Sequence, residues 1–299
     1  MASQKKQSVL NGAVILMVAV VSVKVIGALF KMPLTDMLGT VGRGYFQSAY
    51  EIYTPIFAIS MAGLPVAVSR MVAENVALSK YRDARAVFNV SKRIFLIVGT
   101  VGTLIIFIVA YPYAYFVAGL KSIPAILCVA PSVLFCCYMS AYRGYYEGLR
   151  NMTPTAISQV IEALGKLVVG LLLAKAVMSV GASQYAKGMA ASGAVLGVTV
   201  GSIASLLFLM VCHKIKGDGF ERVQLVNSPK PPKGEAIAKE MIKIAIPMVI
   251  SALILNITNL IDTVTIQARL RTALDKDFNT VIQMHSDAIN EAVRLSRLD

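Results

Sequence analysis

Seven long apolar runs constrain this 299-residue chain more than any other feature. A transmembrane helix needs about 20 mainly apolar residues, and each run is close to that length. Because lipid offers the backbone no hydrogen-bond partners, runs of this kind cross a membrane as helices. The sequence therefore predicts an all-α, polytopic bundle of transmembrane helices. The runs are residues 10–30, 47–69, 94–118, 125–142, 155–177, 188–212 and 244–266.

The composition agrees with an integral membrane protein. Hydrophobic residues make up 57% of the chain and charged residues only 15%, and the mean hydropathy is +0.69. Soluble domains carry about 25% charged residues. The formal net charge of +13 would also suit a nucleic-acid-binding protein. Here, however, the basic residues flank the apolar runs, as they do in the cytoplasmic loops of membrane proteins. We therefore expect no nucleic-acid partner.

The first run contains a lysine at membrane depth. It is too long for a signal peptide, and no small-residue cleavage site follows it. Lys24 lies inside the run, and Lys31 follows seven residues later on nearly the same helix face. Lys31 is expected at the membrane interface, whereas Lys24 either extends to that interface or faces a cavity. Because a charge at membrane depth is costly and usually functional, we favour the cavity for Lys24.

The second run carries residues that a lipid-facing helix has no reason to carry. Gln47, Glu51 and Thr54 share one helix face, and proline and glycine interrupt the run. An acid and a broken helix are tolerated in a membrane only beside other helices or water. We expect this helix to line a cavity that contains Glu51, with Arg43 before it and Arg70 at its end.

The fifth run has a polar stripe of Gln159, Glu162 and Lys166. Glu162 and Lys166 lie four residues apart, in the orientation that favours an ion pair. Two interpretations stay open. Either the two residues neutralise each other and serve packing only, or both face the cavity.

The seventh run has a similar stripe. Asn256, Asn259 and Thr263 share a face, and Asp262 lies beside it. Polar stripes on the first helices of two lobes indicate a cavity between the lobes, where transporters bind substrate. We therefore predict that Asn256, Asn259 and Asp262 line that cavity or bind a coupling ion.

The sixth run contains Gly193, Gly197, Gly201 and Ser205 at four-residue steps. A ladder of small residues lets another transmembrane helix approach closely. We interpret it as a packing feature and not as a binding site.

The residues do not suggest an enzyme. All four cysteines fall in apolar runs, as expected for small buried side chains, and the sequence has no P-loop. Its two histidines, His213 and His285, lie outside the runs. We predict no catalytic residues, no metal site and no cofactor other than a coupling ion, H⁺ or Na⁺. The cysteines are Cys128, Cys136, Cys137 and Cys212.

The composition changes after the sixth run, which indicates a domain boundary. Residues 1–213 form a six-helix lobe, and residues 214–243 form a charged, proline-containing linker with an amphipathic lead-in. Residues 244–266 form the first helix of a second lobe, and residues 267–299 form a polar outer segment. The N-terminus and the loops after runs 2, 4 and 6 hold 17 Lys and Arg, against five in the opposite loops. This asymmetry places the N-terminus in the cytoplasm.

Three segments carry a family resemblance. They read VKVIG at residues 23–27, GLPVAVSR at residues 63–70, and YRGYYEG at residues 142–148, the last followed by NMTPT at residues 151–155. In this order they resemble the polysaccharide-transporter branch of the multidrug/oligosaccharidyl-lipid/polysaccharide exporter superfamily. Within that branch they are most similar to the stage V sporulation protein B and lipid II flippase-like proteins. The resemblance covers about residues 8–165.

The resemblance implies both a fold and a function. The family fold has fourteen spans, in two six-helix lobes plus two further helices, so we expect this chain to be an N-terminal portion. The implied function is a flippase of the bacterial plasma membrane that moves a lipid-linked saccharide with a pyrophosphate to the outer leaflet. Cell-wall, polysaccharide or spore-cortex synthesis would use it, with envelope-synthesis proteins as partners. Lys24, Lys31, Arg43 and Arg70 suit such an anion, and Lys24 would attract the diphosphate as a point charge.

Other functions remain open. A drug exporter of the same superfamily would bind an organic cation through acids such as Glu51 and Asp262, but the basic excess argues against this function. A membrane enzyme would need a general base or nucleophile on an outer loop, and the outer loops before the last run are short and lack histidine. A non-transporting scaffold for envelope or spore assembly would tolerate the loss of Lys24.

The loop charges generate a test of orientation. We expect a cysteine placed at Ser79 to be shielded from an impermeant thiol reagent in intact cells, because Ser79 follows the second run on the basic side. A cysteine placed at Ser183 should be labelled. The opposite labelling pattern would show that the orientation is inverted.

Overall fold

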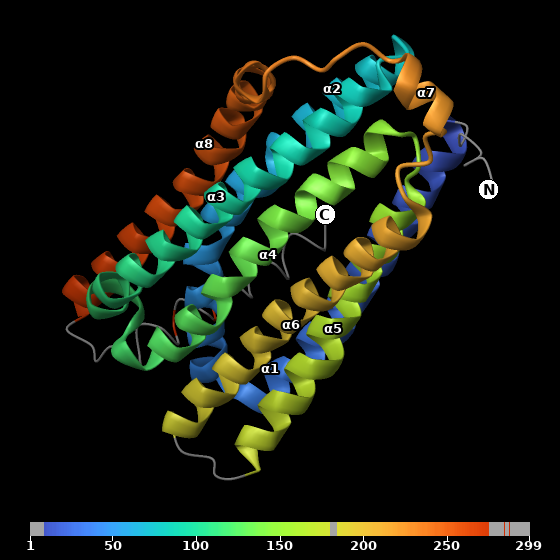
Figure 1. Ribbon diagram of the computed structural model, residues 1–299. Helices are drawn as coiled ribbons and strands as arrows, with labels where there is room; N and C mark the ends of the chain where they lie inside the picture. Colours follow the sequence, from blue (N-terminus) through green and yellow to red (C-terminus); the bar gives the residue numbers. More distant parts are fainter. Residues whose placement is uncertain (1–8, 180–183, 275–283, 285–286, 288–299) are drawn as a thin grey trace.

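The computed structural model describes residues 9–179 and 184–274, together with Met284 and Asp287. Long helices run side by side as a bundle (Figure 1), and the described residues contain no strand, which confirms the all-α, polytopic prediction. The helices are α1 (Val9–Ala62), α2 (Leu64–Ala77), α3 (Tyr81–Tyr113), α4 (Ile123–Gly148), α5 (Thr153–Met178), α6 (Gln184–Lys216), α7 (Arg222–Asn227) and α8 (Gly234–Leu274). A π-helix, η1 (Ala114–Ala118), and a 3-10 helix, η2 (Leu120–Ser122), join α3 to α4.

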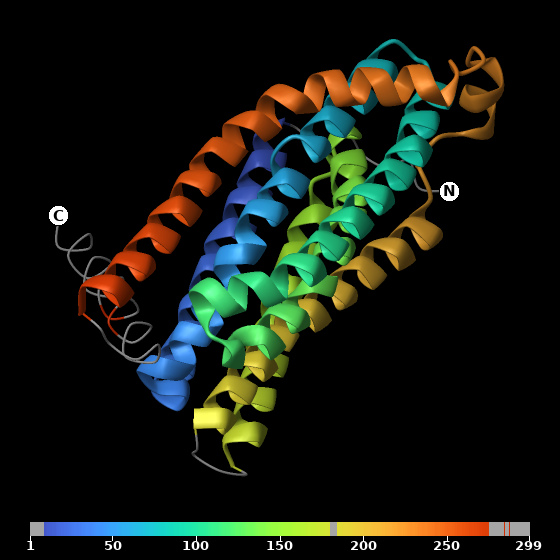
Figure 2. The ribbon, with the colours of Figure 1, turned by 90° about the vertical axis from the view of Figure 1, so that its left-hand side faces the viewer.

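The first helix, α1, turns back on itself. Gly39 has φ 62° and ψ −172°, a conformation that glycine adopts without a Cβ clash. The two arms of α1, residues 9–38 and 40–62, consequently lie side by side (Figure 2), and the ring centroids of Phe30 and Phe46 are 6.1 Å apart. The first apolar run lies in the first arm, and the second run spans the second arm and the start of α2. The residues on both sides of Gly39 are helical, so the two arms are joined by a turn at Gly39.

The chain breaks again at Gly63, between α1 and α2. Pro65 lies in the first turn of α2, where its missing N–H costs no helical hydrogen bond. A Cβ at Gly63 would lie 2.5 Å from the carbonyl oxygen of Ala245 in α8, and one at Gly144 would lie 2.6 Å from the carbonyl oxygen of Pro65. Glycine therefore lets α8 cross the break and lets α4 pack against α2.

Close approach of α5 and α6 confirms the interpretation of the glycine ladder. A Cβ at Gly201 would lie 2.5 Å from the carbonyl oxygen of Glu162, and one at Gly197 would lie 2.5 Å from the Cα of Gly170. The contact brings the two backbones together, as small residues do in membrane helix pairs. It also fixes the position of Glu162 relative to α6.

The segment between α6 and α8 is anchored to α3. Asp218 is buried and forms an ion pair with Arg85, and the N–H of Arg82 donates to the Oγ of Ser228 at 3.1 Å. Helix α6 ends at Lys216 and α8 begins at Gly234, so the amphipathic lead-in of the predicted linker 214–243 is part of α8. Helix α8 then packs along α1, α2 and α3 (Figure 2).

Three boundaries differ from the sequence prediction. Arg143, assigned to a loop, lies inside α4. His213, placed outside the runs, lies in α6, where its ring packs 4.9 Å from that of Phe88. Helix α8 continues to Leu274, so the predicted polar segment 267–299 begins as helix. Apart from Met284 and Asp287, the rest of that segment lies outside the described residues.

Within the described residues, five helical stretches are long and apolar enough to cross a membrane. The first of them contains both arms of α1, and α5, which carries Glu162 and Lys166, is not among them. The count of seven spans therefore stays a prediction. The stretches are Leu10–Ala58, Tyr81–Ala118, Leu120–Gly148, Ala186–Ile215 and Gly234–Thr258.

The contact between α5 and α6 predicts a stability difference between two glycine variants. Gly201→Ala should lower the stability by about 1–3 kcal/mol, because its methyl group would overlap the carbonyl oxygen of Glu162. Gly27→Ala is the matched control, since a Cβ there meets nothing within 4 Å. Thermal unfolding in detergent micelles measures both variants. Equal melting temperatures would contradict the close packing.

Candidate functional site

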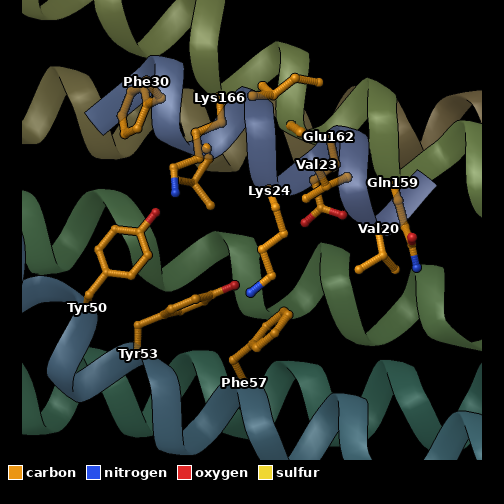
Figure 3. A pocket seen from close by; sticks show the side chains of 14 residues that line it. Val20, Val23, Lys24, Phe30, Tyr50, Tyr53, Phe57, Gln159, Glu162 and Lys166 are labelled. Carbon is orange, nitrogen blue, oxygen red and sulfur yellow. The ribbon is translucent and has the colours of Figure 1, made fainter. Parts of the chain in front are cut away.

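A pocket of about 410 Å³, here called the Lys24 pocket, lies between the two arms of α1 and helices α5 and α6. Figure 3 shows Lys24, Glu162 and Lys166 extending toward the rings of Tyr50 and Tyr53 on the second arm of α1. The turn at Gly39 creates this arrangement, because it makes the two arms face each other. The lining residues are Val20, Val23, Lys24, Ile26, Gly27, Phe30, Tyr50, Tyr53, Phe57, Gln159, Glu162, Ala163, Lys166 and Val198.

A second pocket of about 200 Å³, the Lys31 pocket, adjoins the first. Lys31 and Arg43 both line it, so two further predicted cations lie in a pocket that adjoins the Lys24 pocket. Arg43 also pairs with Asp287, whose Oδ1 lies 3.5 Å from its Nη2. The two pockets share Gly27, Phe30, Tyr50 and Lys166.

Lys166 marks the boundary between the two pockets. Its Nζ lies 5.0 Å from the ring centroid of Phe30 and 4.9 Å from that of Tyr50. These distances suit cation–π contacts, which stabilise an ammonium group without neutralising it. The ion pairs within the described part of the chain do not include Lys24, Lys31 or Lys166. The positive charges of these lysines are therefore available to an anion.

Glu162 pairs with an arginine from another helix. Its Oε2 accepts a hydrogen bond from the Nη2 of Arg143 at 2.9 Å. The ion pair with Lys166, one of the two interpretations of the fifth run, is not the pairing seen here. Spacing along α5 allowed that pair, but the buried guanidinium of Arg143 has more donors to offer than Lys166, and its charge is costly to leave unpaired.

Arg143 belongs to α4, and side chains of two other helices, α5 and α6, hold it by hydrogen bonds. It is 4% exposed, and its Nε donates to the Oγ of Ser158 in α5 at 2.9 Å. Its Nη2 also lies 3.3 Å from the Oγ of Ser205 in α6. Sequence reasoning missed this residue because Arg143 directly follows an apolar run and so resembles the start of a loop. The hydroxyl groups of Ser158 and Ser205 were the available signal, but only tertiary contact relates them to Arg143.

The second arm of α1 presents an aromatic row to the pockets. Neighbouring ring centroids are 4.7 Å apart for Phe46 and Tyr50, 5.8 Å for Tyr50 and Tyr53, and 5.1 Å for Tyr53 and Phe57. The expected polar face of Gln47, Glu51 and Thr54 lies beside this row. It is the aromatic face, together with Gln47, that lines the pockets.

Several predicted site residues lie outside both pockets. Glu51 accepts a hydrogen bond from the hydroxyl of Tyr113 in α3 at 3.0 Å. Arg70 is exposed on α2, and the amide of Asn256 donates to the carbonyl oxygen of Ala252 in its own helix at 2.7 Å. Asp262 is exposed on α8, and the side chain of Asn259 lies outside the described residues.

The described residues contain no group of three His, Cys, Asp or Glu side chains that could hold a metal ion. Cys136, Cys137 and Cys212 are buried, as expected for small apolar side chains, and Cys128 is half-buried. What the site offers chemically is charge and aromatic surface for binding.

Comparison with known proteins adds a family to this geometry. The sequence profile of the family described as "Polysaccharide biosynthesis protein" matches residues 9–283. Two relatives come from Bacillus subtilis (strain 168): stage V sporulation protein B, 28% identical over 269 residues, and the lipid II flippase MurJ, 24% identical over 291 residues. These alignments cover 90% and 92% of this chain but 51% and 53% of the relatives. The chain thus spans about half the length of the curated relatives that it matches.

A solved structure shows the same fold. The chain superposes on a MOP superfamily transporter from Pyrococcus furiosus Vc1 (DSM3638) with a TM-score of 0.69 and 14% identity. The match covers 96% of this chain and 66% of that chain. The helices of this chain are therefore arranged as in the matched part of that structure.

The ion pair between Arg143 and Glu162 predicts how stability responds to mutation. Glu162→Gln should lower the stability by about 3 kcal/mol, because it leaves the buried guanidinium unpaired. Adding Arg143→Met should restore most of this loss, whereas adding Lys166→Met should not. Thermal unfolding of the three variants measures the difference. If adding Lys166→Met to Glu162→Gln restores stability and adding Arg143→Met does not, Lys166 is the partner of Glu162.

Proposed function

Because this chain belongs to the polysaccharide biosynthesis protein family, we propose that it forms part of a flippase in the bacterial plasma membrane. The proposed substrate is a lipid-linked saccharide that carries a pyrophosphate, and the flippase moves it from the cytoplasmic to the outer leaflet. One relative is a lipid II flippase and another is a sporulation protein. Both names fit cell-wall, polysaccharide or spore-cortex synthesis, with envelope-synthesis proteins as partners.

The observation that carries this proposal is the charge of the Lys24 pocket. Arg143 neutralises the carboxylate of Glu162, so the ammonium groups of Lys24 and Lys166 give the pocket an excess of two positive charges. Lys31 and Arg43 line the adjoining pocket. A diphosphate carries at least two negative charges, and its attraction to ammonium groups strengthens where water is excluded. This charge pattern favours an anionic ligand.

The remaining surface of the pocket suits the rest of such a ligand. Tyr50, Tyr53 and Phe57 present ring faces and edges, which pack against apolar surfaces, while Gln159 can hydrogen-bond to hydroxyl groups. We propose that the lysines hold the diphosphate while the rings contact the sugar or the lipid. Transport then requires the two lobes to open alternately to the two leaflets.

Energy for transport would come from the membrane potential or from a coupling ion, H⁺ or Na⁺. Asn256 and Asp262 remain candidates for an ion site, and both lie on α8, outside the two pockets. We further propose that the N-terminus lies in the cytoplasm, on the basis of the loop charges.

A drug exporter fits the pocket less well. Such a protein would bind an organic cation through an acid, but the acid of the Lys24 pocket, Glu162, is already paired with Arg143. The two lysines would repel the cation.

The proposal predicts different outcomes for two substitutions of Lys24. Lys24→Arg keeps the positive charge, so it should retain much of the transport activity. Lys24→Met has a similar length but no charge, and it should abolish transport at normal membrane abundance, because removing a costly charge does not hinder insertion. Complementation of a flippase-deficient strain measures activity. Full complementation by Lys24→Met would favour the scaffold function and would end the anionic-lipid mechanism.

A further inference from the structure

We propose that Arg143 is a positioning residue that sets the charge selectivity of the Lys24 pocket. It holds the carboxylate of Glu162 against α4 and so keeps Lys166 available to the anionic part of the ligand. The inference rests on the proposed function, because it requires that the ligand be anionic. It concerns a residue that touches neither pocket.

The geometry gives Arg143 one orientation. Its guanidinium is buried and donates to Glu162 at 2.9 Å, to Ser158 at 2.9 Å and to Ser205 at 3.3 Å. The hydroxyl of Ser205 donates in turn to the carbonyl oxygen of Ser158 at 2.8 Å. Because both Nε and Nη2 donate hydrogen bonds, the planar guanidinium cannot rotate without leaving buried polar atoms unpaired. Arg143 is therefore a fixed positive charge beside Glu162.

Glu162 has an alternative partner within reach. Lys166 lies four residues further along α5, in the order that favours an ion pair on a helix. In the structure Lys166 instead lies against the rings of Phe30 and Tyr50. If a neutral residue replaced Arg143, the Glu162 carboxylate would keep its charge at the pocket wall and would turn toward Lys166. The pair would be neutral, and the carboxylate would repel an incoming diphosphate.

Arg143 thus decides how many positive charges the ligand meets. With Arg143 in place, Lys24 and Lys166 both remain for the diphosphate. Without it, Glu162 cancels one of them. Losing one charged hydrogen bond to the ligand should weaken binding by about 10- to 100-fold. Ligands without charge should bind as before, because the shape of the pocket and its rings are unchanged.

The test measures binding to the purified full chain in lipid nanodiscs. Farnesyl diphosphate is the anionic probe and farnesol is the uncharged one. Arg143→Met should weaken binding of farnesyl diphosphate by about 10- to 100-fold and leave binding of farnesol within about twofold. Adding Glu162→Gln should restore the affinity for farnesyl diphosphate, because the competing carboxylate is gone. Arg93→Met, an exposed arginine on α3, is the matched control and should bind both probes as wild type does.

A second variant guards against misfolding. Arg143→Gln keeps an amide donor close to Ser158 and removes the charge, so it should show the same selective loss and can replace Arg143→Met. Equal weakening of both probes would mean that Arg143 serves only to fold the protein, and the inference would be wrong. Unchanged binding of farnesyl diphosphate would also overturn it.

Two lysine variants separate this inference from the function on which it rests. If Lys24→Met and Lys166→Met both lose farnesyl diphosphate while Arg143→Met does not, the proposed function stands and the positioning role fails. If wild type prefers farnesol, or if the lysine variants bind farnesyl diphosphate normally, the anionic-ligand function itself fails.

Discussion

The close contact between α5 and α6 is the constraint on which the site depends. Gly197 and Gly201 bring the two backbones so near that a single methyl group at either position would clash. At this separation Ser158 of α5 and Ser205 of α6 both reach the guanidinium of Arg143. A wider spacing would leave that buried charge without its hydrogen bonds, and the Glu162 carboxylate would then lose its partner.

Charge is distributed according to what each environment tolerates. Arg143 is fully enclosed and has an acid and two hydroxyl groups as partners. Lys24 and Lys166 form none of the ion pairs seen among the described residues, and they line open space or lie against aromatic rings. Unpaired charges at membrane depth are retained where they serve a ligand. The lysines of the Lys24 pocket therefore stay accessible, because Arg143, which lies outside the pocket, neutralises the carboxylate of Glu162.

Two of the segments that carry the family resemblance meet in space. Gly144, in the segment at residues 142–148, packs on the carbonyl oxygen of Pro65, in the segment at residues 63–70. Gly63, at the start of the same segment, is crossed by α8. These residues are explained by helix packing. Arg143, which directly precedes Gly144 in the motif, is the member that pairs with a pocket residue, Glu162.

The sequence by itself determined that the chain is helical and crosses a membrane. The thickness of the bilayer sets the length of the apolar runs, and its apolar core limits their charge. The sequence also singled out Lys24, Lys31, Arg43, Glu162 and Lys166, which line the two pockets, since any charge beside or inside such a run is conspicuous. Only the tertiary structure decided which of them meet. The turn at Gly39 makes the arms of α1 face each other, and the partner of Glu162 comes from another helix and not from four residues along its own. Pairing depends on distances between helices, and spacing along one helix does not contain that information.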